Sequence, residues 1–145
     1  MDYWEGKTKS LENKIIRNAF SKGALKWGFT HGVRNKRAID SANWEQAYQS
    51  IDREGQNEVQ LALFYDYKTN VEFYPVWQAH LRNNQVPMLV TWGEHDPYFS
   101  VKGANLLKND VQDIDIHVLD TGHFPLEEES DFIIDKTRVL MSKVN

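Results

Sequence analysis

The chain has 145 residues, of which 41% are apolar and 12% aromatic, and its formal net charge is −4. This composition supports a folded core and argues against general disorder. The net negative charge argues against nucleic-acid binding, which needs a basic surface. Cysteine is absent, which excludes disulfides and a thiol nucleophile and fits a cytoplasmic protein, and no apolar run approaches the roughly 20 residues of a membrane span.

Four helices are predicted in the first 85 residues. Apolar side chains recur at helical spacing in residues 11–25, 41–53, 57–67 and 71–82. Gly55 is well placed to end the second helix. Proline is tolerated in a helix mainly in its first turn, so Pro75 predicts a break near residue 70 and a separate fourth helix after it.

The segment 86–128 is predicted to form a β-α-β unit. Apolar runs at 88–92 and 114–119 are typical of strands, and residues 100–107 between them have helical character. Residues 127–144 form a last helix. In an open parallel sheet, reactive groups gather at the carboxyl ends of the strands, so the loops that follow the two strands are expected to lie side by side.

An acid follows the first strand and a histidine follows the second. Asp96 and His123 are 27 residues apart, which suits one strand, one helix and one strand. Neighbouring strands lie about 4.8 Å apart, so the two side chains are predicted to reach hydrogen-bond distance. A carboxylate in that place holds the imidazole in one tautomer and stabilises its charged form. Singly, Asp96 would be an ordinary turn residue and His123 an ordinary surface histidine; together they predict a functional dyad.

The same stretch resembles the C-terminal end of an α/β-hydrolase, the fold of epoxide hydrolases, haloalkane dehalogenases and many esterases. In that family the acid closes a Gly-x-x-Asp turn and the base follows a glycine. The matching residues here are Gly93-Glu94-His95-Asp96 and Gly122-His123, continued by Phe124-Pro125-Leu126-Glu127. The resemblance implies an α/β fold with a helical cap segment over residues 1–85 and the C-terminal part of the hydrolase core over residues 86–145.

The resemblance also implies a function, although this sequence lacks one part of the family's catalytic pattern. The family hydrolyses small, largely apolar esters, epoxides or haloalkanes through a nucleophile-acid-histidine triad, here with Asp96 as acid and His123 as base and without a cofactor. No glycine pair in this sequence brackets a serine or aspartate in the elbow pattern that carries the nucleophile. We therefore expect a fragment that is inactive alone and needs a missing N-terminal half as its partner. The alternatives are a non-catalytic binding or remnant module of that fold, and another small α/β domain with an accidental Asp-His pair.

Aromatic residues are dense in the cap segment. Five of them fall between residues 65 and 77, and packing is the ordinary role of aromatics at helical spacing. The other interpretation is the lining of an apolar substrate pocket. In the family, cap tyrosines hydrogen-bond an epoxide oxygen and cap tryptophans hold a leaving halide. The candidate substrate-binding residues are accordingly Tyr65, Tyr67, Tyr74 and Trp77.

No metal site is predicted. Three adjacent glutamates at residues 127–129 cannot all point one way on a helix, and they suit its first turn because the helix dipole favours negative charge there. His95 and His117 are weak candidates for metal ligands. His117 is within a strand and has no second ligand at a spacing typical of metal sites, and His95, next to Asp96 in the loop, could instead line the site.

Overall fold

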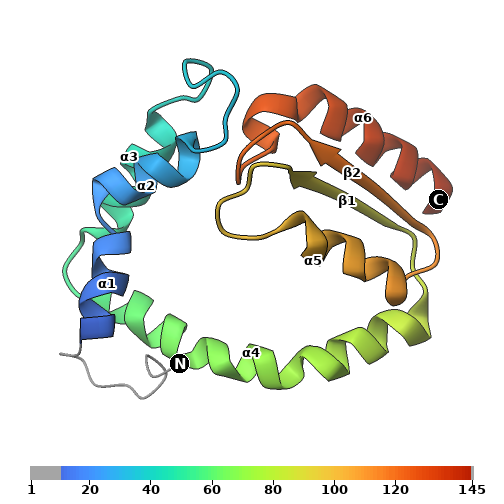
Figure 1. The fold of residues 1–145 in the computed structure, drawn as a ribbon, viewed down its shortest axis with the longest axis horizontal. Coiled ribbons are helices and arrows are strands. Elements are labelled where there is room, and N and C mark those ends of the chain that lie inside the picture. Colours follow the sequence, from blue (N-terminus) through green and yellow to red (C-terminus); the bar gives the residue numbers. More distant parts are fainter. Residues whose placement is uncertain (1–10, 145) are drawn as a thin grey trace. The chain divides into compact units, whose positions relative to one another are not determined.

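The computed structural model describes the backbone of residues 11–144, with side chains from residue 14 onward. Contacts divide these residues into two compact units, one of residues 11–27 and 41–75 and the other of residues 28–40 and 76–144. Both units are drawn in Figure 1. Their bounds differ from the predicted cap at 1–85 and core at 86–145, and that domain division stays a prediction.

The first unit is helical. It contains α1 (Leu11–Ala19), most of α2 (Lys22–Thr30), α3 (Ala42–Ile51) and the first part of α4 (Gln56–Asn84). The single helix predicted over residues 11–25 is two helices, because the chain turns at Ser21, whose Oγ accepts a hydrogen bond from the Ala24 N–H at 3.2 Å. A serine in that place caps the helix that follows.

Buried apolar side chains join the helices of the first unit. Phe20, Trp44 and Leu61 are all at most 9% exposed. The Phe20 ring lies 5.9 Å from that of Phe64. On the surface of the same unit, the Arg17 guanidinium donates to the Glu58 carboxylate at 2.7 Å.

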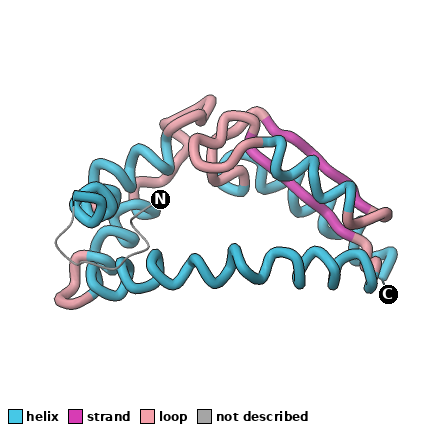
Figure 2. Tube along the Cα trace, turned by 60° about the horizontal axis from the view of Figure 1, so that its bottom comes forward, coloured by secondary structure: helices cyan, strands magenta, loops and turns pink. Residues whose placement is uncertain are grey.

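Helix α4 is one continuous helix of 29 residues, and the predicted break near residue 70 is wrong. Figure 2 shows it as a single run of helix. Thr69, beside the predicted break, donates its hydroxyl to the Asp66 carbonyl at 2.8 Å and so satisfies its polar group inside the helix. Pro75 lies in the helix interior, where it removes one backbone donor. The boundary between the two units falls directly after this proline.

The second unit contains the predicted β-α-β arrangement. Strands β1 (Met88–Gly93) and β2 (Ile114–Leu119) pair in parallel, with Met88 opposite Ile114 and Gly93 opposite Leu119. The crossover between them is α5 (Val101–Leu106) with a 3₁₀ turn, η2 (Leu107–Asn109), and β2 is followed by α6 (Leu126–Val144). Helices α5 and α6 flank the strand pair (Figure 1). The α/β class and the strand positions predicted from the sequence are confirmed.

The connection from α4 to β1 depends on Gln85. This residue has a φ of 45°, the left-handed conformation that ends many helices. Its side-chain amide donates to the Asp110 carbonyl at 2.9 Å and accepts from the Gln112 N–H at 2.9 Å. The end of α4 is thereby tied to the segment that leads into β2, which sets the start of the strand pair.

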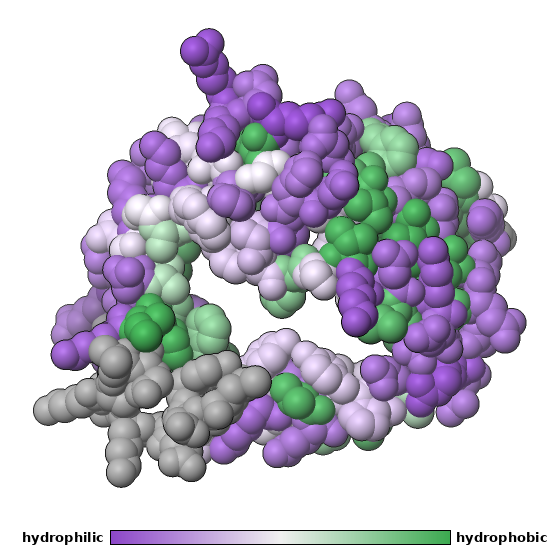
Figure 3. All heavy atoms as spheres, in the orientation of Figure 1, coloured by the Kyte–Doolittle hydropathy of each residue, from purple (hydrophilic) through white to green (hydrophobic). Residues whose placement is uncertain are grey.

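Apolar side chains remain at the surface of both units. Leu63 and Phe73 of α4 and Val118 of β2 are each more than 40% exposed, and Figure 3 shows apolar residues among polar ones on one face of the molecule. Within residues 11–144, no helix is both long enough and apolar enough to cross a membrane.

Candidate active site

The structure brings Asp96 and His123 together at the carboxyl ends of the two strands. The Nδ1 atom of His123 lies 2.9 Å from Oδ2 of Asp96. The Asp96 side chain is 6% exposed and that of His123 is 25% exposed. Because a carboxylate accepts only, Nδ1 carries the proton in this contact. The geometry is that of a histidine held in one tautomer by a buried acid.

The backbone around Asp96 holds its carboxylate in place. Its second oxygen, Oδ1, accepts hydrogen bonds from the N–H groups of Tyr98 at 2.8 Å and Phe99 at 3.1 Å. Burial acts to raise the pKa of Asp96, but the hydrogen bond from His123 and the two backbone donors outweigh it, so the pKa lies below its usual range. Asp96 is therefore ionised at neutral pH and available to stabilise a charged imidazole.

Replacement of Asp96 by asparagine is expected to destabilise the fold in a pH-dependent way. Because folding depresses the pKa of Asp96, its stabilisation is fully present above the unfolded-state pKa of about 3.9 and is lost as the pH falls through the lower folded-state value. The variant should unfold about 2 kcal/mol more easily at pH 7, the range for a hydrogen bond to a charged group. Urea unfolding from pH 2 to pH 7 checks this. Asp135→Asn, at an exposed ion pair of α6, is the control and should change little; a D96N deficit that persists at pH 2 would contradict the ionic account.

Three aromatic rings surround the His123 imidazole. The ring centroids of Phe124 and Tyr98 lie 4.6 and 4.9 Å from it in edge-on geometry, and that of Phe99 lies at 5.7 Å. Phe124 is itself stacked on Phe29 at 4.1 Å. These contacts restrict rotation of the imidazole. The rings thus hold His123 in one orientation beside Asp96.

A cavity opens beside the pair. Its volume is about 170 Å³, and Trp92, Phe99, His123 and Pro125 are among the residues that line it. The Trp92 indole donates to the Phe99 carbonyl at 3.1 Å, which anchors one wall. The cavity is smaller than the 300–1,000 Å³, roughly, of common ligand pockets, and its lining combines apolar side chains with Thr91 and the Asp96-His123 pair.

Glycines allow the two strand ends to approach closely. A Cβ atom on Gly93 would overlap the carbonyl oxygen of Gly122 and would come within 2.8 Å of that of Thr121. A Cβ atom on Gly122 would in turn overlap the carbonyl oxygen of His31. The turn that carries Asp96 and the turn that carries His123 are therefore in backbone contact, and glycine is required at both places.

The segment of residues 28–35 packs against these turns. The sequence analysis did not predict this contact. Besides the stacking of Phe29, the backbone N–H of Arg34 donates to the Glu128 carboxylate at 3.1 Å, and its guanidinium pairs with Glu129. Gly32, with a φ of 74°, lies against the backbone of His95. Arg34 is separated by more than 90 residues from Glu128 and Glu129, and no local pattern indicates such a contact.

The predicted substrate-binding residues all lie on α4, and the structure joins two of them. The hydroxyl groups of Tyr67 and Tyr74 are hydrogen-bonded at 2.8 Å, and this bond raises the pKa of Tyr74. Tyr65 instead faces the Lys68 ammonium, which lies 4.0 Å from its ring centroid. Trp77 belongs to the second unit, whereas the three tyrosines belong to the first.

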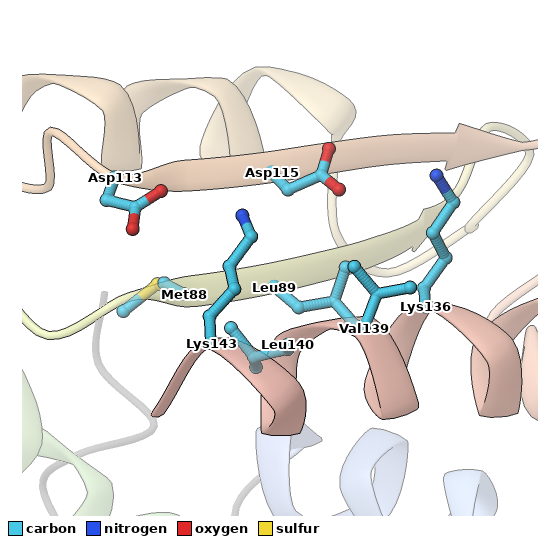
Figure 4. A pocket seen from close by; sticks show the side chains of 8 residues that line it. All are labelled: Met88, Leu89, Asp113, Asp115, Lys136, Val139, Leu140 and Lys143. Carbon is cyan, nitrogen blue, oxygen red and sulfur yellow. The ribbon is translucent and has the colours of Figure 1, made fainter. Parts of the chain in front are cut away.

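A second cavity lies between the strands and α6. Figure 4 shows its lining, with Lys136 and Lys143 of α6 on one side and Asp113 and Asp115 on the other. Its volume of about 10 Å³ is about that of one water-sized probe, so it holds no substrate. Among residues 11–144, no group of three or more His, Cys, Asp or Glu side chains is arranged to hold a metal ion.

Comparison with known proteins bears on the fold. No protein-family model matches the chain. It is 42% identical over 96 residues to Uncharacterized hydrolase YNR064C of Saccharomyces cerevisiae, a stretch that is 66% of this chain and 33% of the yeast protein. The crystal structure of a His-tagged serine hydrolase involved in carbazole degradation, the CarC enzyme, is similar with a TM-score of 0.65 and 20% identity, over 85% of this chain and 48% of that one.

These findings define the fold of the chain. The parallel strand pair, the crossover helix and the similarity to a serine hydrolase show that the chain has the C-terminal part of the α/β-hydrolase fold. The resemblance seen in the sequence is confirmed. The chain spans about a third of the length of the yeast hydrolase and about half that of the CarC enzyme.

Proposed function

We propose that this chain supplies the acid and the base of an α/β-hydrolase-type hydrolase. The observation that carries the proposal is the 2.9 Å contact of His123 Nδ1 with Asp96 Oδ2 at the ends of adjacent parallel strands. With Nδ1 engaged by the carboxylate, Nε2 is the nitrogen that exchanges protons with substrate or water. The hydrolase named among the relatives, at 42% identity, supports the same class of reaction.

The mechanism follows from this division of roles. A serine or aspartate nucleophile on an elbow, which these 145 residues do not contain as a sequence pattern, attacks an electrophilic carbon and forms a covalent intermediate, while the bond from that carbon to the leaving alcohol oxygen, epoxide oxygen or halide breaks. A serine nucleophile passes its proton through His123 to the departing alcohol. His123 then removes a proton from the attacking water, and Asp96 stabilises the resulting imidazolium. The aromatic rings around His123 exclude bulk water from the imidazole faces, which strengthens its interaction with the carboxylate.

The substrate proposed is a small, largely apolar ester, epoxide or haloalkane. The apolar residues that line the cavity beside His123 support this class. The hydrogen bond between the Tyr67 and Tyr74 hydroxyls uses one of their two phenol protons, and both tyrosines stay predictions as substrate-binding residues. Tyr65 and Trp77 stay predictions as substrate-binding residues.

The proposal is tested on the native protein isolated from its source. Mass spectrometry is expected to find a Gly-x-Ser-x-Gly or Gly-x-Asp-x-Gly segment, either in the same polypeptide or in a second one that copurifies. The purified protein should then hydrolyse p-nitrophenyl acetate, styrene oxide or 1-bromobutane. A serine elbow predicts the ester, and an aspartate elbow predicts the epoxide or the haloalkane.

The opposite result would contradict the proposal. If no elbow segment accompanies the chain and none of the three substrates is turned over, Asp96 and His123 have no nucleophile to serve. The non-catalytic binding module would then be the better account of the chain.

A further inference from the structure

A second histidine-carboxylate pair spans the same two turns. His95 immediately precedes Asp96, and Asp120 lies three residues before His123. The Nε2 atom of His95 is 2.9 Å from Oδ1 of Asp120, and both side chains are about half exposed. The two turns are therefore joined by two separate side-chain contacts, of which the proposed mechanism uses only one.

Backbone hydrogen bonds extend the strand pair into this region. The Glu94 N–H donates to the Leu119 carbonyl at 2.7 Å, and the His95 N–H donates to the Thr121 carbonyl at 3.0 Å. His95 thus contacts the turn of His123 through both its backbone and its side chain. The side-chain contact with Asp120 adds a further constraint on the separation of the two turns beyond the last strand residue.

Charged groups from two other segments surround the pair. The Arg34 Nε lies 3.9 Å from Asp120 Oδ2, and its guanidinium also pairs with Glu129 of α6. Gly32 lies against the His95 backbone. Asp120 is consequently held between His95 and Arg34, which limits the positions that its turn can adopt.

We propose that His95 and Asp120 are positioning residues for the Asp96-His123 pair. Their contact sets the spacing of the two turns, so that Nδ1 of His123 remains within hydrogen-bond distance of the acid. An exposed ion pair contributes little to global stability, whereas a misplacement of about 1 Å at a reacting group costs about 100-fold in rate. The role in catalysis rests on the proposed function; the effect on geometry does not.

The test uses the 145-residue chain and the proton resonance of the His123 Nδ1–H, which reports its hydrogen bond to Asp96 directly. In His95→Ala we expect this proton to exchange with water about tenfold faster or to disappear. His95→Gln should restore it, because the glutamine amide can donate to Asp120 in place of Nε2. Asp120→Ala, which removes the contact from the other turn, should reproduce the loss. His80→Ala, at a histidine of α4 that contacts Asn84, is the control and should leave the resonance unchanged.

Each outcome decides the proposal. Loss in both alanine variants with recovery in His95→Gln supports it, even if the native protein proves to have no hydrolase activity. An unchanged resonance in His95→Ala and Asp120→Ala overturns it, whatever activity is found. In an active hydrolase, His95→Ala is further expected to lower kcat by tenfold or more and to leave KM within twofold.

Discussion

Replacement of His123 by glutamine in the hydrolase that contains this chain is expected to lower turnover by about 100- to 10,000-fold, the contribution of a general base. Glutamine cannot accept a proton near neutral pH, so it cannot act as the base that His123 supplies. If the nucleophile is an aspartate, attack still proceeds and the covalent intermediate should accumulate. Steady-state rates and intact-protein mass spectrometry after substrate addition measure both effects.

His117→Gln is the matched control for this substitution. His117 also lies close to an aspartate, with Nε2 at 2.9 Å from Asp115 Oδ2, but it lies within β2 and packs against Phe132 of α6. Its replacement should leave turnover within about twofold. Equal rates for His123→Gln and the unsubstituted protein would remove His123 from the mechanism.

Replacement of Gly93 by alanine is expected to have the largest effect on stability. The added Cβ would meet backbone atoms of Thr121 and Gly122, which cannot move aside as a flexible side chain can. Forced overpacking of this kind costs about 3 kcal/mol or less in most proteins and occasionally more. Because whole domains are stable by only about 5–15 kcal/mol, the variant should unfold at a clearly lower urea concentration than the unsubstituted chain.

Gly103→Ala separates the steric effect from the general effect of removing a glycine. Gly103 lies in α5 and has no atom near the position of an added Cβ, so alanine there should stabilise the chain by up to about 1 kcal/mol through helix propensity. Urea midpoints of the two variants, compared with the unsubstituted chain, give the contrast. Equal midpoints for Gly93→Ala and the unsubstituted chain would mean that the two strand ends do not approach each other closely.

Helix α4 shows where local rules were insufficient. Pro75 predicted two helices because its ring removes a backbone donor, yet the structure continues through it. Apolar residues recur at helical spacing on both sides of the proline, and one lost hydrogen bond is a local cost that a helix of this length tolerates. The predicted single helix over residues 11–25 failed for a related reason, since the serine cap at residue 21 is a one-residue feature within an otherwise continuous apolar pattern.

Part of the candidate site could be predicted from the sequence. The spacing of Asp96 and His123 on either side of one crossover helix predicted their contact, because parallel strands place successive end loops next to each other. The pair His95 and Asp120 lies in the same two loops but has no family pattern of its own. Nothing in the sequence indicated that Arg34 joins them.

The sequence by itself determined the strands, the crossover and the acid-histidine pair, because each depends on short-range periodicity and on the fixed geometry of a β-α-β unit. Only the tertiary structure decided what surrounds the imidazole. The stacking of Phe29 on Phe124 and the contacts of Arg34 with Glu128 and Glu129 join segments that are more than 90 residues apart. Such contacts depend on how whole elements pack, and a local pattern of residue types does not predict that packing.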